Sequence, residues 1–273
     1  MESLTAPEKN ARFRGRSLEM MILISRHGYV SKKRLKETFG KKVYQENLRR
    51  NIRHLIKAGL IEYFTGDDDH RLGYRLTKQG LLFCNKSDLI PKKTIRARPF
   101  FKSTYDHDER VIDFSLILSK SPLVSNFRLE YELRAECGRE HFRQNVYRDK
   151  FKVPDGLFTL KTPNGIFEVA FEYERTQKSE KRYEHFFKNL SISRKFQLVF
   201  IVVKEATLLS RLERLLKKVR AKDPDVMHSN QRNGIYFTDE KTLLEEGLDA
   251  PWSGDGKSLT LKEVEQRVNE KPA

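Results

Sequence analysis

Residues 153–175 read VPDGLFTLKTPNGIFEVAFEYER, and this stretch decides the fold of the larger part of the chain. The four residues 162–165, Thr-Pro-Asn-Gly, are typical of a turn. The side chains before and after them alternate as in β-strands, so the sequence predicts a hairpin with strands over 155–160 and 166–175. One face of the second strand is formed by Phe167, Val169, Phe171 and Tyr173. Its other face carries Glu168, Ala170, Glu172 and Glu174.

Carboxylates therefore gather on one face of an otherwise apolar strand. Asp155 begins the first strand of the hairpin, which brings it near Glu172 and Glu174. Like charges so close together disfavour ionisation, so a cation must compensate them. Mg²⁺ is one candidate, because this hard cation prefers carboxylate and water oxygens. The alternative is pairing with nearby arginines, which are Arg134, Arg139, Arg143 and Arg148.

The segments around the hairpin predict an α/β (α+β) domain over residues 104–248. Helices are expected over 108–119, 179–191, 206–221 and 239–246, and further strands over 127–135 and 234–237. The run QLVFIVV, residues 197–203, is continuously apolar, which is typical of a strand buried on both faces. Residues 249–273 are predicted to form a peripheral C-terminal tail, with Trp252 as a packing anchor and one helix over 261–268.

The N-terminal part predicts a different, smaller domain. Helices are expected over 17–26, 32–39 and 44–58, with Ser31 capping the second and Gly59 ending the third. Short strands over 60–64 and 72–76 then form a hairpin. Three helices followed by a hairpin resemble a winged helix-turn-helix, and HLIKAGLIEYF (54–64) with YRLTKQG (74–80) carries this resemblance. The predicted organisation is a basic arm (1–15), a winged-helix domain (16–90), a linker (91–103) and the larger domain.

The charge is concentrated in the N-terminal part. The 273 residues carry 54 Lys and Arg against 38 Asp and Glu, a formal net charge of +16. Residues 1–103 alone hold 24 basic and 10 acidic side chains. Such an asymmetry indicates a polyanionic partner, and nucleic acid is the natural one because neutralising phosphates releases condensed counterions. The alternative is a basic surface that merely keeps the protein soluble.

Basic side chains also fall on the predicted outer faces of two helices. A winged helix would use such side chains for phosphate and major-groove contacts to duplex DNA. A solvated face with no ligand is the alternative interpretation. The candidate DNA-binding residues are Lys32, Lys33, Asn47, Arg50, Arg53, His54, Lys57 and Arg71.

The hairpin resembles the PD-(D/E)xK superfamily of restriction-endonuclease-like proteins, whose motif is Pro-Asp, a loop, and then acid-x-Lys on the next strand. Here Pro154-Asp155 is followed, after sixteen residues, by Glu172-Tyr173-Glu174. The resemblance implies a restriction-endonuclease-like mixed sheet and makes Asp155, Glu172 and Glu174 candidate catalytic and Mg²⁺-binding residues. Glu174 stands where the superfamily has its lysine, which favours an inactive nuclease fold over an active one.

A closer resemblance is to the replication-relaxation family of plasmid and mobile-element proteins. That family joins a winged helix to a nuclease-like domain and is associated with plasmid replication, relaxation or mobilisation. Its marks are similar to His107-Asp108, Pro154-Asp155-Gly156 and the run from Glu172 to Thr176. The resemblance extends over residues 16–205 and implies relaxase or replication proteins as partners.

These patterns predict a DNA-binding accessory protein, with two alternatives: a Mg²⁺-dependent DNA endonuclease and a winged-helix transcriptional regulator. Two cysteines, Cys84 and Cys137, exclude a disulfide scaffold and favour a cytoplasmic location. The first sixteen residues lack the apolar run of a signal peptide, and no stretch resembles a membrane span. Winged-helix proteins often dimerise, so a homodimer stays open.

Overall fold

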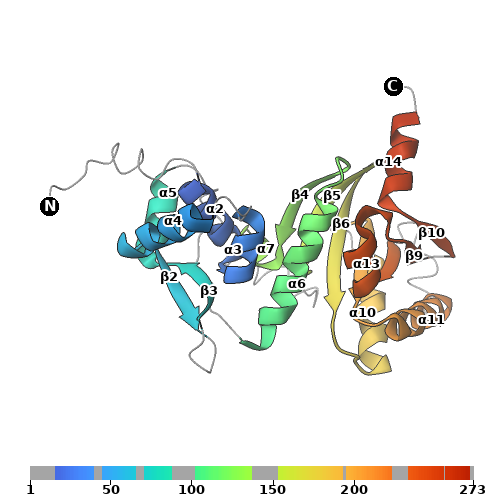
Figure 1. Ribbon diagram of the computed structural model, residues 1–273. Helices are drawn as coiled ribbons and strands as arrows, with labels where there is room; N and C mark the ends of the chain where they lie inside the picture. The colour runs from blue at the N-terminus through green and yellow to red at the C-terminus, as the bar shows by residue number, and fades with distance from the viewer. Residues whose placement is uncertain are drawn as a thin grey trace. The chain divides into compact units, whose positions relative to one another are not determined.

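The computed structural model describes residues 16–39, 45–65, 71–87, 102–136, 153–192, 195–222, 233–254 and 256–270 (Figure 1). The chain divides into two compact units. The first comprises Met1–Tyr105 with Arg134–Gly138, and the second comprises Asp106–Leu133 with Arg139–Ala273. The predicted basic arm, and the predicted linker as far as residue 101, lie outside the described residues. No helix in the described part of the chain is long and apolar enough to cross a membrane.

The first unit contains the three predicted helices and both predicted strands. Its elements are α2 (Arg16–His27), β1 (Tyr29–Ser31), α3 (Lys32–Phe39), α4 (Gln45–Lys57), β2 (Ile61–Thr65), β3 (Arg71–Leu76) and α5 (Lys78–Lys86). The strands form an antiparallel sheet in the order β1-β3-β2. Buried apolar side chains of α2, α4 and the sheet make one core, which includes Met21, Leu55 and Ile61.

Local sequence signals set the ends of these helices. The Ser31 hydroxyl accepts a hydrogen bond from the Arg34 amide at 3.0 Å, as expected of a helix cap. Gly59 has a φ of +68°, and the amides of Gly59 and Leu60 bond back to Ile56 and Leu55 at the end of α4. This left-handed turn is the usual glycine-dependent way to end a helix.

Two elements of this unit are absent from the sequence-based prediction. The strand β1 is only three residues long, too short for a periodic signal. The helix α5 follows β3 directly, and the Thr77 hydroxyl caps it by accepting a hydrogen bond from the Gly80 amide. A Cβ atom at Gly80 would lie 1.9 Å from the Leu60 carbonyl oxygen, so glycine lets the helix approach the backbone before β2.

The second unit is built on a seven-stranded mixed sheet in the order β10-β9-β8-β7-β6-β5-β4. Its strands are β4 (Val124–Leu129), β5 (Gly156–Thr162), β6 (Gly165–Glu174), β7 (Leu198–Val203), β8 (Gly234–Asp239), β9 (Trp252–Gly254) and β10 (Lys257–Leu259). Strands β6, β7 and β8 are parallel, and the outer pairs are antiparallel. The predicted hairpin is β5–β6, and the predicted doubly buried strand is the central β7. The molecule is therefore of mixed α/β class, with this sheet and the smaller one.

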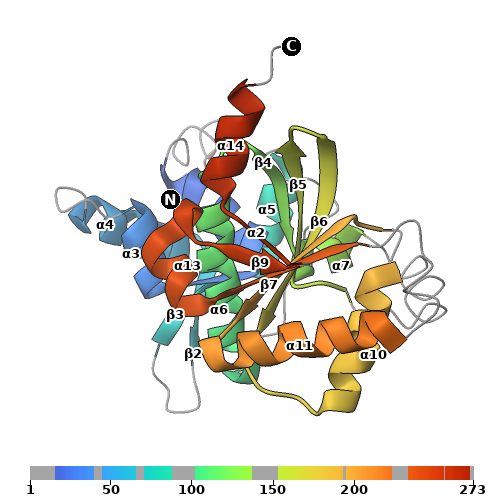
Figure 2. The same cartoon turned by 90° about the vertical axis from the view of Figure 1, so that its right-hand side faces the viewer.

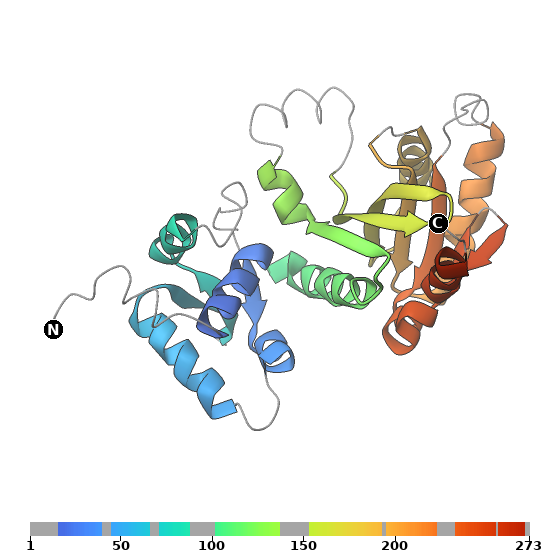
Figure 3. The same cartoon turned by 90° about the horizontal axis from the view of Figure 1, so that it is seen from above.

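Helices cover both faces of the large sheet. They are α6 (Lys102–Leu118), α7 (Glu130–Glu136), α10 (Glu180–Ile192), α11 (Ala206–Lys222), α13 (Glu240–Glu246) and α14 (Leu261–Glu270), with a short 3₁₀ turn, η3 (Gly247–Asp249). In Figures 2 and 3, α6 and α13 lie on one side of the sheet and α10 and α11 lie on the other. Side chains of α6, α13 and α14 share one core with Phe171 and Val202, whereas α10 and α11 share another with Ala170 and Ile201. The alternation along β6 and β7 sends successive residues to opposite cores.

Two predictions for this unit differ from the structure. The segment predicted as a strand over 127–135 is instead the end of β4 followed by α7. The Glu132 carboxylate accepts a hydrogen bond from the Leu129 amide at the point where the strand ends and the helix begins. Residues 249–273, predicted as a peripheral tail, add β9 and β10 to the sheet. Trp252 is completely buried and stacks on Phe200, with ring centroids 4.3 Å apart, so this segment completes the core.

Candidate nucleic-acid interface and buried acidic cluster

The helix α4 separates its apolar and basic residues onto two faces. Leu48, Ile52 and Leu55 are buried in the core of the first unit. Because a helix repeats every 3.6 residues, positions 47, 50, 54 and 57 form a stripe on the other side. All five candidates on this helix are exposed, namely Asn47, Arg50, Arg53, His54 and Lys57. Arg49 is exposed as well and was not among the predicted residues.

The remaining DNA-binding candidates lie on neighbouring elements. Lys32 and Lys33 are exposed in the first turn of α3. Lys33 makes a wide ion pair with Glu37, 3.7 Å apart, and both side chains are largely solvated, so the pair holds Lys33 only weakly. Arg71 begins β3, but its side chain lies outside the described atoms.

The acidic cluster lies where β5 begins and β6 ends. Asp155, Glu172 and Glu174 are all buried, with exposed fractions of 4 to 6%. Residue Gly156 pairs with Phe171, so Asp155 comes alongside the last residues of β6. One Asp155 oxygen, Oδ2, accepts a hydrogen bond of 2.9 Å from the Tyr173 amide, which lies between the two glutamates in sequence.

His107 of α6 contacts the same Asp155 oxygen. Its Nε2 lies 3.2 Å from Asp155 Oδ2, and its Nδ1 lies 3.4 Å from Asp108 Oδ1. Burial alone would lower the pKa of this imidazole, but the carboxylates of Asp108 and Asp155 outweigh it and raise the pKa to about 10. His107 is therefore an imidazolium at neutral pH. The sequence named His107 as a mark of the replication-relaxation resemblance. It did not predict this contact with Asp155, because nothing in the spacing links α6 to β5.

A second cation approaches Glu174. Lys178 Nζ lies 2.5 Å from Glu174 Oε2, and the carboxylate is nearly buried while the lysine is one-third exposed. Lys178 lies between the end of β6 and α10, four residues after Glu174, where the strand alternation no longer predicts direction. Arg175 instead faces Asp106, at 3.9 Å. The cations that lie against Asp155 and Glu174 are thus a histidine and a lysine.

The sequence offered four arginines as partners of this cluster. Arg134 is exposed on α7, while Arg139, Arg143 and Arg148 lie outside the described residues. Among the residues that the structure describes, no group of three His, Cys, Asp or Glu side chains is close enough to hold a metal ion. His107 and Lys178 lie against carboxylate oxygens that the sequence offered to Mg²⁺.

The chain was compared with protein-family models, with curated proteins and with solved structures, and none of them matches it.

Proposed function

We propose that this protein binds double-stranded DNA through its N-terminal unit, used as a winged helix. One observation carries the proposal: α4 exposes a stripe of Asn47, Arg50, His54 and Lys57, with Arg53 beside it, and is followed at once by the β2–β3 hairpin. In this proposal α4 enters the major groove and the hairpin is the wing. The charge of residues 1–103 supports a phosphate-rich partner.

For the second unit we propose a restriction-endonuclease-like fold used for binding. The order α6, then antiparallel β4, β5 and β6, then α10, then β7 parallel to β6 agrees with this proposal. The paired acids of the cluster favour a structural role. The whole protein would then act as an accessory factor in plasmid or mobile-element replication, relaxation or mobilisation, as the resemblance to the replication-relaxation family suggests.

The DNA-binding proposal is tested on the full chain with a fluorescently labelled duplex. Arg50→Ala with Arg53→Ala should weaken binding at least about tenfold at moderate salt, because each arginine supplies charge-assisted contacts to phosphate. Lys204→Ala with Lys241→Ala is the matched control, since both lysines are exposed on the second unit. Equal losses in the two double variants would contradict a specific role for α4.

The alternative of a transcriptional regulator shares the same docking and differs in the DNA site. Footprinting on the DNA that carries the gene separates the two: protection at an origin of replication or transfer supports the accessory factor, and protection at a promoter supports the regulator. Neither outcome bears on how α4 contacts the duplex.

A Mg²⁺-dependent endonuclease is the second alternative, and three buried carboxylates near the ends of β5 and β6 are the observation that favours it. Buried ionisable groups are common at catalytic sites, although structural ion-pair networks also contain them. Supercoiled-plasmid nicking with added Mg²⁺ or Mn²⁺ tests it. Nicking by the parent that Glu172→Gln abolishes, with DNA affinity unchanged, would establish the nuclease and overturn the binding-only role.

A further inference from the structure

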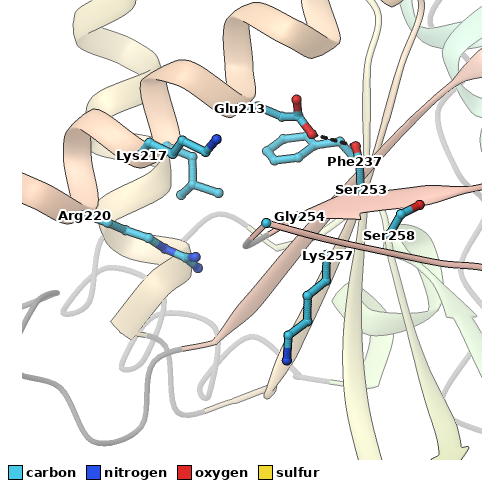
Figure 4. Close-up of a pocket in the computed structure, with 10 residues that line it drawn as sticks. Glu213, Lys217, Arg220, Phe237, Ser253, Gly254, Lys257 and Ser258 are labelled. Atoms are coloured by element: carbon cyan, nitrogen blue, oxygen red, sulfur yellow. Dashed lines mark hydrogen bonds between the residues drawn. The ribbon is translucent and has the colours of Figure 1, made fainter.

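A cavity of about 260 Å³ lies in the second unit, away from the acidic cluster in the fold, between α11 and the β9–β10 hairpin (Figure 4). The helix contributes Glu213, Leu216, Lys217 and Arg220, and the hairpin contributes Ser253, Gly254, Gly256, Lys257 and Ser258. Phe237 of β8 lies at the back, and together with Leu216 it makes an apolar wall. The hairpin belongs to the segment 249–273, which the sequence predicts to be a peripheral tail.

Three of the charged groups that line this cavity are cations, and one is an acid. Lys217 and Lys257 are exposed, one on each side of the cavity. The carboxylate of Glu213 is engaged, because its Oε1 accepts a hydrogen bond of 2.6 Å from the Ser253 hydroxyl (Figure 4). The formal charge of the lining is therefore +2, which favours a ligand with two negative charges.

Arg220 gives the cavity a fixed positive charge. Only 7% of this residue is exposed, and its Nη2 donates a hydrogen bond of 2.7 Å to the Asn233 carbonyl. Asn233 is itself held, since its side-chain amide donates to the Leu190 carbonyl at 2.8 Å. A guanidinium held in one position beside an apolar wall attracts an anion more strongly than a solvated one, because the surrounding dielectric constant is lower.

We propose that this cavity binds a phosphate dianion, either free or as the monoester group of a larger molecule. Arg220 supplies the fixed charge, and the exposed Lys217 and Lys257 contact the phosphate from the helix side and the hairpin side. The hydroxyl of Ser258, exposed on the hairpin, supplies a neutral donor. Free phosphate, a nucleoside monophosphate and the phosphorylated end of an oligonucleotide share this chemistry, and the cavity volume admits a phosphate with a small organic group. The proposal is independent of DNA docking by α4.

The test is calorimetric titration of the full chain at constant ionic strength. The probes are inorganic phosphate, adenosine 5′-monophosphate, and a short oligonucleotide with and without a 5′-phosphate. Saturable binding of inorganic phosphate or of a phosphomonoester is expected, and Lys217→Ala with Lys257→Ala should weaken it about tenfold for each cation removed. Arg214→Ala is the matched control, because Arg214 is exposed on the same helix and does not line the cavity.

The relative affinities of the probes identify the ligand class, and two outcomes overturn the proposal. Tighter binding of the nucleotide than of inorganic phosphate assigns the cavity to nucleotides, and a preference for the phosphorylated oligonucleotide assigns it to a strand end. Equal affinities assign it to free phosphate. The absence of saturable binding for every probe overturns the proposal. Binding that the double lysine variant retains, or that Arg214→Ala weakens equally, overturns it too, because the anion would then bind elsewhere on the surface.

Discussion

A single carboxylate oxygen of Asp155 accepts hydrogen bonds from the Tyr173 amide and from the imidazolium ring of His107. The imidazolium of His107 is thus a structural cation that ties α6 to the start of β5. Its pKa is raised from 6.5 to about 10, so this contribution to stability is complete below about pH 6.5 and is lost as the pH rises towards 10. A hydrogen bond to a charged group contributes about 2 kcal/mol.

His107→Gln should therefore lower the free energy of unfolding by about 2 kcal/mol at pH 6, and the difference from the parent should shrink as the pH approaches 10. Urea unfolding followed by Trp252 fluorescence measures this, because the single tryptophan is buried in the core of the second unit. His185→Gln is the control, since His185 is exposed on α10. A difference that stays constant from pH 6 to pH 10 would rule out the charged form.

The pair of Glu174 and Lys178 supports a second prediction at this scale. Lys178→Met removes a cation from a carboxylate that is nearly buried and should cost about 2 kcal/mol. Adding Glu174→Gln should recover most of that loss, because the uncompensated charge is then gone. A double-mutant cycle measured by Trp252 fluorescence gives the coupling, with Lys204→Met as the exposed control. Additive losses would mean that the two side chains do not interact in solution.

Individual residues of the cluster could be predicted only in part. The positions of Asp155, Glu172 and Glu174 follow from strand alternation and the hairpin turn, which are local properties. The partners of Asp155 and Glu174 do not, because they depend on how α6 packs and on the loop after β6. His107 lies 48 residues from Asp155, and no pattern within one element reports such a contact.

At the scale of elements, β7 is the central strand of the second unit, and its side chains contribute to both of that unit's cores. Its residues are buried alternately in the two cores, and it lies in the middle of the sheet between β6 and β8. Val202→Asp would bury a charge among apolar side chains and should cost about 4 kcal/mol or more. Thermal unfolding followed by Trp252 fluorescence checks this. Lys204→Asp, just past the strand and exposed, should melt close to the parent.

The helix α5 offers a test of the first unit. Gly80→Ala places a Cβ atom against the Leu60 carbonyl, which is backbone and cannot move aside, so the helix should detach at a cost of about 1–3 kcal/mol. Cys84 of α5 is 1% exposed, and burial raises the pKa of its thiol to about 11. In a Cys137→Ser background, Gly80→Ala should speed thiol labelling at Cys84. Gln79→Ala, at an exposed neighbour, should leave the rate unchanged.

The elements that could be predicted are those with a repeated pattern. The helices α2, α3 and α4, the β5–β6 hairpin and β7 each contain enough residues to show a regular periodicity. The strands β1, β9 and β10 have three residues each. The first two pair with the longer strands β3 and β8, and β10 pairs with β9. Their existence depends on tertiary pairing, which explains why the C-terminal segment was predicted as a tail.

At the scale of the whole molecule, the net charge is concentrated in the N-terminal part of the chain. Residues 1–103 carry a net charge of +14, and the remaining 170 residues carry +2. If DNA is held by the first unit, the salt dependence of binding must come from its cations. Each lost phosphate contact lowers the slope of log affinity against log salt by about 0.9.

Arg50→Ala with Arg53→Ala should therefore reduce the slope by about 1.8, if each arginine contacts one phosphate. Lys204→Ala with Lys241→Ala removes the same charge from the second unit and should leave the slope unchanged. Fluorescence anisotropy over a series of salt concentrations, on duplexes of unrelated sequence, measures both slopes. Equal reductions would mean that DNA responds to the net charge of the protein, and that α4 has no privileged contact with the phosphates.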